Sequence, residues 1–296
     1  MNGSRRFLSP KVLAAISRLD LKARLIVEGF VSGLHQSPFH GFSVEFADHR
    51  EYTPGDDIRH IDWKVYAKSD RFSIKEFEEE TNLKCTMLLD VSESMRYRSG
   101  ETSKLEYGSV LVATLSHLLL HQQDATGLVL FDSDIRRHVP ESSRPSHILA
   151  ILAELDRAVA EQKTDVSVLF HKIAEKIKRR GMVLLVSDLF CPVEPLMRGL
   201  KHFRHKRHEV VVFQIVDPFE RDFPFEDNTL FKGLEGYPEL LTEPRSLKAA
   251  YLKNFRDHAE AIRKACADQR IDFVQIGTDQ PLETVLPRYL AMRARR

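Results

Sequence analysis

Apolar residues gather into short, nearly continuous runs along the later part of the chain. The runs cover residues 83–90, 125–131, 182–188, 209–217 and 271–277. A short apolar run of this kind is typical of a strand that is buried on both faces, as in a parallel sheet covered by helices. The pattern therefore predicts a mostly parallel sheet built from these runs.

The segments between the runs have a different spacing. In 165–179 and again in 245–268, apolar residues recur at intervals of three to four positions, which indicates amphipathic helices. Strands that alternate with helices imply right-handed βαβ crossovers and a doubly wound sheet. Residues 83–296 are therefore predicted to form a doubly wound, Rossmann-like α/β domain.

The first part of the chain is mixed in pattern. Apolar residues at helical spacing run through 10–32, and extended pieces follow around 40–57 and 71–77, separated by a Pro-Gly turn. We predict a smaller N-terminal α+β segment over residues 1–82.

Charge and composition narrow the classes of function. The 296 residues carry 44 Lys and Arg against 43 Asp and Glu, and the net charge of +1 gives no general attraction to nucleic acid or to an anionic membrane. No stretch has the apolar character of a signal peptide or the length of a membrane span. Three cysteines lie far apart without a CxxC pair, which argues against disulfides and against zinc. We therefore expect a cytoplasmic protein with no transmembrane segment and no nucleic-acid partner.

One local cluster of charge departs from this balance. The stretch 201–208 is dense in lysine, arginine and histidine. We interpret it as the solvated end of a helix, where cations lie near the C-terminal dipole. Docking of an acidic partner there is the secondary interpretation.

Oxygen-bearing side chains follow two of the predicted strands and precede one predicted helix. The set consists of Asp90, Ser92, Ser94, Thr164 and Asp188. Ligands of a doubly wound sheet bind outside the carboxyl ends of its strands, so we expect these side chains to converge at that edge. Hydroxyl and carboxylate oxygens suit a hard cation, Mg²⁺ first and Mn²⁺ or Ca²⁺ as alternatives. With only two carboxylates, the ion would stay electrophilic and could accept a carboxylate from another molecule.

Simpler interpretations remain open. An Asp-x-Ser-x-Ser string alone is weak evidence, because Ser92 or Ser94 could cap a following helix, and Thr164 could cap the helix that it precedes. A haloacid-dehalogenase-type phosphatase would need an aspartate at position 92. The sequence also places no His, Cys or Lys beside Asp90 or Asp188, so we expect no catalytic residue. A metal-dependent phosphoester hydrolase is kept as the alternative function.

The same residues resemble the metal-ion-dependent adhesion site of von Willebrand factor A domains. The Asp-x-Ser-x-Ser string follows the first sheet strand, a threonine lies before a helix, and a second aspartate follows a later strand. The resemblance implies that Ser92, Ser94 and Thr164 are direct or near-direct ligands. It implies that Asp90 and Asp188 act through water or hold the hydroxyl groups.

A second resemblance covers more of the chain, from about residue 41 to at least 190. Its elements are Arg50, Tyr52, Pro54-Gly55-Asp56, Asp62-Trp63-Lys64 and Lys75-Glu76-Phe77-Glu78, followed by the string Leu88-Leu-Asp-Val-Ser-Glu-Ser-Met95. They are similar to the bacterial family called Domain of Unknown Function 58. Members commonly accompany MoxR-type AAA+ ATPases and are thought to act as adaptors or assembly factors. The resemblance implies a metal-dependent protein-interaction module whose partner is such an ATPase, or a client protein that offers an acidic side chain.

Overall fold

The computed structural model describes residues 44–51, 63, 66, 72–79, 83–160, 166–177, 179–234 and 239–294. The chain forms two compact units, which are described separately. One unit spans Phe39–Leu83, and the other contains every described residue from Lys84 onward. The helix expected within 10–32 lies outside the described residues, and so does Thr164.

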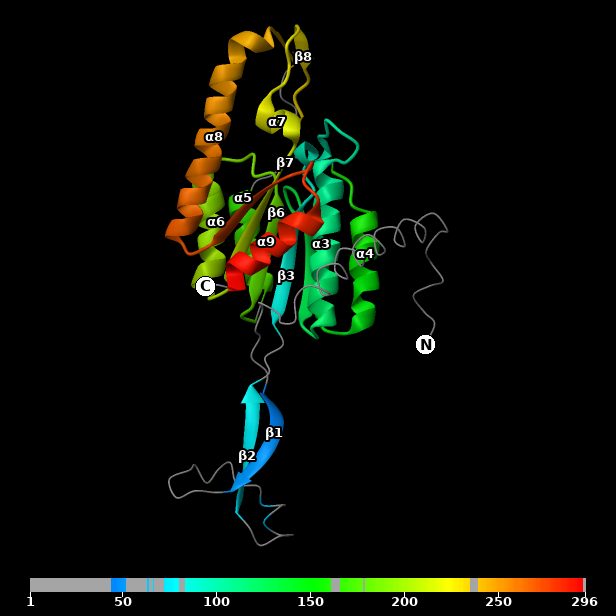
Figure 1. Ribbon diagram of the computed structural model, residues 1–296, viewed down its shortest axis with the longest axis vertical. Coiled ribbons are helices and arrows are strands. Elements are labelled where there is room, and N and C mark those ends of the chain that lie inside the picture. The colour runs from blue at the N-terminus through cyan, green and yellow to red at the C-terminus, as the bar shows by residue number, and fades with distance from the viewer. Residues whose placement is uncertain are drawn as a thin grey trace. The chain divides into compact units, whose positions relative to one another are not determined.

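A six-stranded sheet forms the centre of the larger unit (Figure 1). Its strands are β3 (Lys84–Asp90), β4 (Ala125–Phe131), β5 (Ile135–Ser142), β6 (Met182–Ser187), β7 (Glu209–Val216) and β10 (Asp272–Gly277). Their spatial order is β5-β4-β3-β6-β7-β10, and all neighbouring pairs are parallel except β4 with β5. The predicted doubly wound, mostly parallel sheet is confirmed. The edge strand β5 was not predicted, because its residues are largely exposed and form no apolar run.

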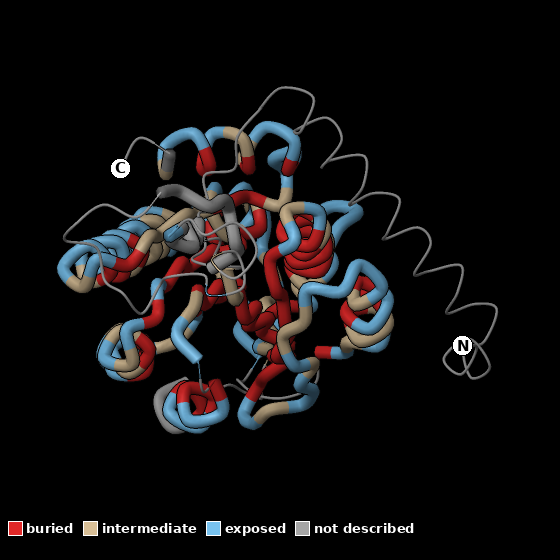
Figure 2. Tube along the Cα trace, turned by 90° about the horizontal axis from the view of Figure 1, so that it is seen from below, coloured by how far each residue is buried: buried red, intermediate tan, exposed pale blue. Residues whose placement is uncertain are grey.

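Helices cover both faces of this sheet. The main helices are α3 (Lys104–His121), α4 (Ile148–Asp156), α5 (Val166–Lys176), α6 (Val193–His205), α8 (Pro244–Asp268) and α9 (Leu282–Ala294). Alternate residues of β3 face opposite layers: Leu89 lies against Gly108 of α3, whereas Leu88 belongs to the core beneath α5 and α6. Figure 2 shows the buried strands enclosed by helices whose outer sides are exposed. The strands are therefore apolar on both sides, as their sequence pattern indicates.

Short elements complete the unit. They are the 3-10 helices η3 (Glu93–Arg96) and η4 (Pro145–His147), the helix α7 (Pro218–Asp222), and the antiparallel pair β8 (Thr229–Phe231) and β9 (Leu240–Thr242). Aromatic rings hold α7 and β8 beside α8: Phe223 stacks on Phe231, and its ring centroid lies 4.6 Å from that of Tyr251. Within the described ranges, no helix combines the length and apolar composition that crossing a membrane requires.

The smaller unit contains an antiparallel strand pair. Strand β1 (Val44–Glu51) pairs with β2 (Ser73–Glu79), and the register shifts once between Phe46 and Asp48. These strands correspond to the extended pieces expected around 40–57 and 71–77. The Tyr66 ring contacts the Trp63 ring edge-on and stacks on the Phe72 ring, with a distance of 4.4 Å between the Tyr66 and Phe72 ring centroids.

The close packing of α5 on α6 yields the first prediction. A Cβ atom at Gly199 of α6 would lie 2.8 Å from the Cβ of Phe170 on α5, which is too close for any real contact. We expect Gly199→Ala to lower the free energy of unfolding by about 1–3 kcal/mol, because the two helices must move apart. The control is Gly100→Ala, where an added Cβ meets nothing within 4 Å. Urea unfolding in which both variants match the wild type would contradict this account of α5–α6 packing.

Candidate metal centre

The strand order creates a switch point in the middle of the sheet. Strands β3 and β6 are neighbours there, and the connections that follow them lead toward opposite edges. In a doubly wound sheet, the crevice at the carboxyl ends of such a strand pair is where ligands bind. Asp90 is the last residue of β3, and Asp188 comes directly after β6. The topology thus brings the two predicted aspartates to the same edge of the sheet.

Asp90 is a buried carboxylate held by neutral donors. Its side chain accepts a 2.8 Å hydrogen bond from the backbone N–H of Ser92 and a 2.6 Å bond from the Ser187 hydroxyl. Burial, and then the nearby charge of Asp188, raise the pKa of Asp90 to about 7. Among the described residues, no lysine or arginine forms an ion pair with Asp90. The site therefore lacks positive charge at this carboxylate.

The two serines of the Asp-x-Ser-x-Ser string face each other. Their Oγ atoms are 3.0 Å apart, and the Ser92 side chain is buried. Ser92 does precede the 3-10 helix η3, but its side chain accepts no capping hydrogen bond. The simple interpretation of Ser92 as a helix cap therefore fails. Its hydroxyl lies in the same cluster as Asp90 and Ser94.

A lysine that sequence analysis did not place near Asp188 lies beside it. The fully buried Lys104 ammonium lies 2.8 Å from Asp188 Oδ2 and 2.7 Å from Glu220 Oε1. Burial by itself would lower the pKa of Lys104, but the charges of Asp188 and Glu220 outweigh it and raise the pKa above its ordinary value. Lys104 is therefore a charged ammonium, and it supplies a positive charge to this edge of the sheet.

Three separate elements position this ion pair. Lys104 is the first residue of α3, whose start is set by a capping box between Ser103 and Glu106. Glu220 lies in α7 and closes a second capping box with Asp217. The Phe190 ring covers the lysine, with its centroid 4.6 Å from Nζ. The sequence distances of 84 and 116 residues explain why sequence analysis missed the contacts.

Two further polar residues hydrogen-bond to Asp90 and Asp188 at this edge, and sequence analysis did not identify them. Ser187 donates to Asp90 and accepts from the backbone N–H of Leu189. Gln214 on β7 donates to the backbone carbonyl of Asp188 at 3.0 Å. The sequence did contain a signal for each of them: Ser187 is a serine at the end of β6, and Gln214 is a glutamine within the otherwise apolar strand β7. Thr164, the remaining predicted ligand, lies outside the described residues.

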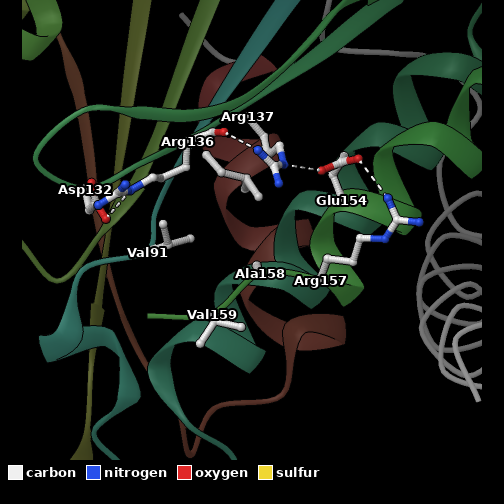
Figure 3. Close-up of a pocket in the computed structure, with 9 residues that line it drawn as sticks. Val91, Asp132, Arg136, Arg137, Glu154, Arg157, Ala158 and Val159 are labelled. Atoms are coloured by element: carbon white, nitrogen blue, oxygen red, sulfur yellow. Dashed lines mark hydrogen bonds and ion pairs between the residues drawn. The ribbon is translucent and has the colours of Figure 1, made fainter. Parts of the chain in front are cut away.

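A basic hollow lies on one side of the Asp-x-Ser-x-Ser loop (Figure 3). It has a volume of about 350 Å³ and is lined by Val91, which follows Asp90, together with side chains from β5 and the end of α4. Figure 3 shows Arg137 and Arg157 reaching Glu154 from two sides, with nitrogen–oxygen distances of 3.3 and 3.5 Å. Both arginines are more than half exposed. Their remaining N–H groups can meet an acidic molecule.

An apolar groove lies on the other side of the loop. It has a volume of about 800 Å³, and its lining includes Ser94, Phe190, Tyr251 and Phe255. Phe190 is 45% exposed, although its inner side covers Lys104. Such a volume is typical of grooves that take several side chains or a small ligand.

The described residues suit a hard divalent cation. Asp90 and the hydroxyls of Ser92 and Ser94 offer only oxygen, and burial together with the charge of Asp188 raises the pKa of Asp90, so a nearby cation would favour its ionised form. Asp188 is already shared with Lys104 through Oδ2, while its Oδ1 accepts from the backbone N–H of Phe190 at 3.2 Å. A cation would therefore be held mainly through Asp90 and the two serines, with Asp188 beside them.

The raised pKa of Asp90 predicts how the metal-free protein responds to pH. The folded-state pKa is about 7 and the reference value is 3.8, so between these values the folded protein binds a proton that the unfolded chain does not. The stability of the metal-free protein should therefore fall as pH rises from about 4 to 7. In chelator at pH 8, Asp90→Asn should be more stable than the wild type by about 1–3 kcal/mol, because its amide is neutral.

Urea unfolding at pH 4 and at pH 8 measures this effect. Near pH 4 the advantage of Asp90→Asn should disappear, since the wild-type carboxyl is then protonated in the folded state. Asp134→Asn is the control, because that carboxylate is exposed and its pKa is lowered by the Ile135 N–H group and by Lys172. An Asp90→Asn variant that is less stable than the wild type at both pH values would refute the charge shortage.

The Lys104 ion pairs yield a second prediction for this edge. Lys104→Met keeps the length of the side chain but leaves Asp188 and Glu220 without their cation. Breaking a buried pair in this way should lower the free energy of unfolding by about 3–5 kcal/mol. Lys172→Met, which removes an exposed pair with Asp134, should cost no more than about 1 kcal/mol. Equal losses in the two variants, by thermal or urea unfolding, would contradict the central role of Lys104.

Several known proteins are similar to this chain. A relative described as "Uncharacterized protein Rv1480" from Mycobacterium tuberculosis is 23% identical, with 97% of this chain and 91% of the relative covered. Among solved structures, an aerotolerance-related membrane protein from Bacteroides fragilis matches at 13% identity and a TM-score of 0.49, covering 72% of this chain and 98% of that one. The SpRpn10 VWA domain matches at 13% identity and a TM-score of 0.39, covering 70% and 94%.

The match to a protein family spans most of the chain. Residues 48–261 match the family described as "Protein of unknown function DUF58". The matched range includes both aspartates of the sheet edge, Lys104 and Glu220. The chain belongs to the DUF58 family.

Proposed function

We propose that this protein is a metal-dependent protein-interaction module. In this proposal a divalent cation, Mg²⁺ first, is held at the carboxyl edge of the sheet and a partner's acidic side chain binds to it. The observation that carries the proposal is Asp90, a buried carboxylate at the switch point whose pKa is raised to about 7 by burial and by the nearby charge of Asp188. Ser92, Ser94 and Asp188, together with the predicted ligand Thr164, complete the proposed set.

The charge balance at the edge supports a role in binding. Lys104 neutralises one of the carboxylates around it, so Asp90 and one further carboxylate stay uncompensated when all are ionised. A bound Mg²⁺ supplies positive charge with an open position that a further carboxylate can fill. The hydroxyls of Ser92 and Ser94 add oxygen without adding charge.

The surroundings of the edge favour a protein partner over a small anion. The groove beside Ser94 exposes aromatic surface from Phe190 and α8, which suits apolar side chains. The hollow on the other side carries Arg137 and Arg157, which suit acidic groups. A partner segment with an acidic residue flanked by apolar residues matches this combination.

The partner that the family resemblance favours is a MoxR-type AAA+ ATPase, or a client that such an ATPase acts upon. The similarity of the segment 45–80 and of the string after it to that bacterial family is the support for this choice. In such a pair the chain would act as the adaptor, and the ATPase would supply the energy.

The hydrolase alternative gains no base from Lys104. Lys104 is the basic side chain nearest Asp188, and both its carboxylate partners keep it protonated. A protonated amine can neither attack a phosphorus atom nor take a proton from water. Turnover of p-nitrophenyl phosphate that disappears in Asp90→Asn would nevertheless favour the hydrolase.

A binding experiment tests the proposal. A purified MoxR-type ATPase from the same organism should be retained by the immobilised protein in Mg²⁺ and released by EDTA. Ser92→Ala and Asp90→Asn should each weaken retention by about tenfold or more, because each alters the proposed metal ligands. Ser146→Ala is the matched control, since Ser146 is an exposed serine in η4.

Calorimetric titration with Mg²⁺ separates the two steps of the proposal. The wild type and Ser146→Ala should bind Mg²⁺, whereas Asp90→Asn should not. Partner binding that is indifferent to EDTA and to Ser92→Ala would contradict the metal bridge. Mg²⁺ binding without retention of the ATPase would leave the metal site standing and exclude that partner.

A further inference from the structure

Three metal-ligating side chains meet on the helical layer formed by α5 and α6. They are His171 and Glu175, one turn apart on α5, and His202 in the last turn of α6. Helix α6 starts beside the Asp90 edge and His202 lies nine residues along it, about 14 Å away at 1.5 Å per residue. The cluster is therefore separate from the candidate metal centre.

The three side chains already lie close to metal-binding geometry. The His171 and His202 ring centroids are 4.3 Å apart, and His202 Nε2 lies 3.6 Å from Glu175 Oε1. One ligand atom from each residue lies within 4.8 Å of the others. Around a tetrahedral zinc ion with bonds of about 2.0–2.2 Å, ligand atoms are about 3.3–3.6 Å apart. Small side-chain rotations therefore suffice to bring the three groups onto one ion.

The backbone beneath the cluster is held firmly. Phe170 precedes His171 and Phe203 follows His202, and these two fully buried rings pack 5.9 Å apart between the helices. Gly199 allows the close approach of α6 to Phe170. The histidines thus project from two fixed helix positions, which limits the ordering that metal binding requires.

The electrostatics of the cluster also suit a cation. A 2.8 Å ion pair and hydrogen bond with Lys206 lowers the pKa of Glu175, with a smaller contribution from His202, so Glu175 is a carboxylate at neutral pH. Lys206 also donates to the carbonyl of Ala174, and its side chain is about one-third exposed. The position of the Lys206 ammonium shows that this part of the surface attracts positive charge. Because the Lys206 side chain is partly exposed, it can rotate into solvent when a metal ion binds.

We propose that His171, Glu175 and His202 form a zinc-binding site that ties α5 to α6. Two imidazoles and one carboxylate are a ligand set that prefers Zn²⁺ or a neighbouring transition metal to Mg²⁺. The cysteine pattern argues against zinc only for cysteine-based sites, and this set uses no cysteine. Because α5 follows directly after the segment that carries Thr164, such a tie would fix the position of that helix against α6.

Zinc titration of the untagged, chelator-treated protein in excess Mg²⁺ tests the site. Calorimetry should detect one Zn²⁺ per chain, and Zn²⁺ should raise the temperature of unfolding. His171→Ala and His202→Ala should each weaken Zn²⁺ binding by about tenfold or more, because each removes one of three ligands. Lys206→Met should strengthen binding severalfold, since it removes the competing ammonium.

Matched variants identify the binding groups. His205→Ala removes an exposed histidine of the same helix, and Cys191→Ser removes the most accessible of the three cysteines, so both should retain full affinity. Asp90→Asn should also bind Zn²⁺ as the wild type does. The proposal is overturned if both His171→Ala and His202→Ala bind as the wild type does. It is equally overturned if His205→Ala, Cys191→Ser or Asp90→Asn loses the Zn²⁺ that the wild type binds.

Discussion

The buried ammonium of Lys104 is the interaction on which the functional edge of this protein depends. It joins the start of α3, the end of β6 and helix α7 through Asp188 and Glu220, at distances of 2.8 and 2.7 Å. A buried charge is tolerated only when it is paired, so these elements are bound to one arrangement. The same lysine limits how much negative charge remains for an added cation. Three carboxylates and one ammonium leave two negative charges at the edge when all four groups are ionised.

Asp90 is the carboxylate of this edge that no described ammonium or guanidinium contacts. The strand β3 delivers it to the switch point of the sheet, where Ser92 and Ser187 satisfy its oxygens without neutralising it. The fold therefore stores an electrostatic cost at one carboxylate that a divalent ion would relieve. The exposed aromatic surface of Phe190 lines the same groove as Ser94, and its ring also covers Lys104. Phe190 therefore belongs both to the buried charge pairing and to the proposed partner surface.

The helices on the two faces of the sheet differ in what they can contribute. Helix α3 carries Lys104 inward to the candidate metal centre, and Gly108 lets the helix lie close to Leu89. Helices α5 and α6 instead direct their polar residues outward, where His171 and His202 meet above the Phe170–Phe203 contact. The hard oxygen set and the imidazole set would select different metals, so the two candidate sites need not compete.

The sequence by itself determined the sheet and the identity of the oxygen-bearing residues at its edge. Each inner strand is buried on both faces, so an apolar run marks it, and the strand ends then place Asp90 and Asp188 at one edge. The edge strand β5 has no apolar run in the sequence, because none of its residues is fully buried. Only the tertiary structure decided that Lys104 and Glu220 reach Asp188 and that two helices bring His171 to His202. Those contacts join residues far apart in the chain, and no local pattern encodes a contact that depends on how helices pack across a finished sheet.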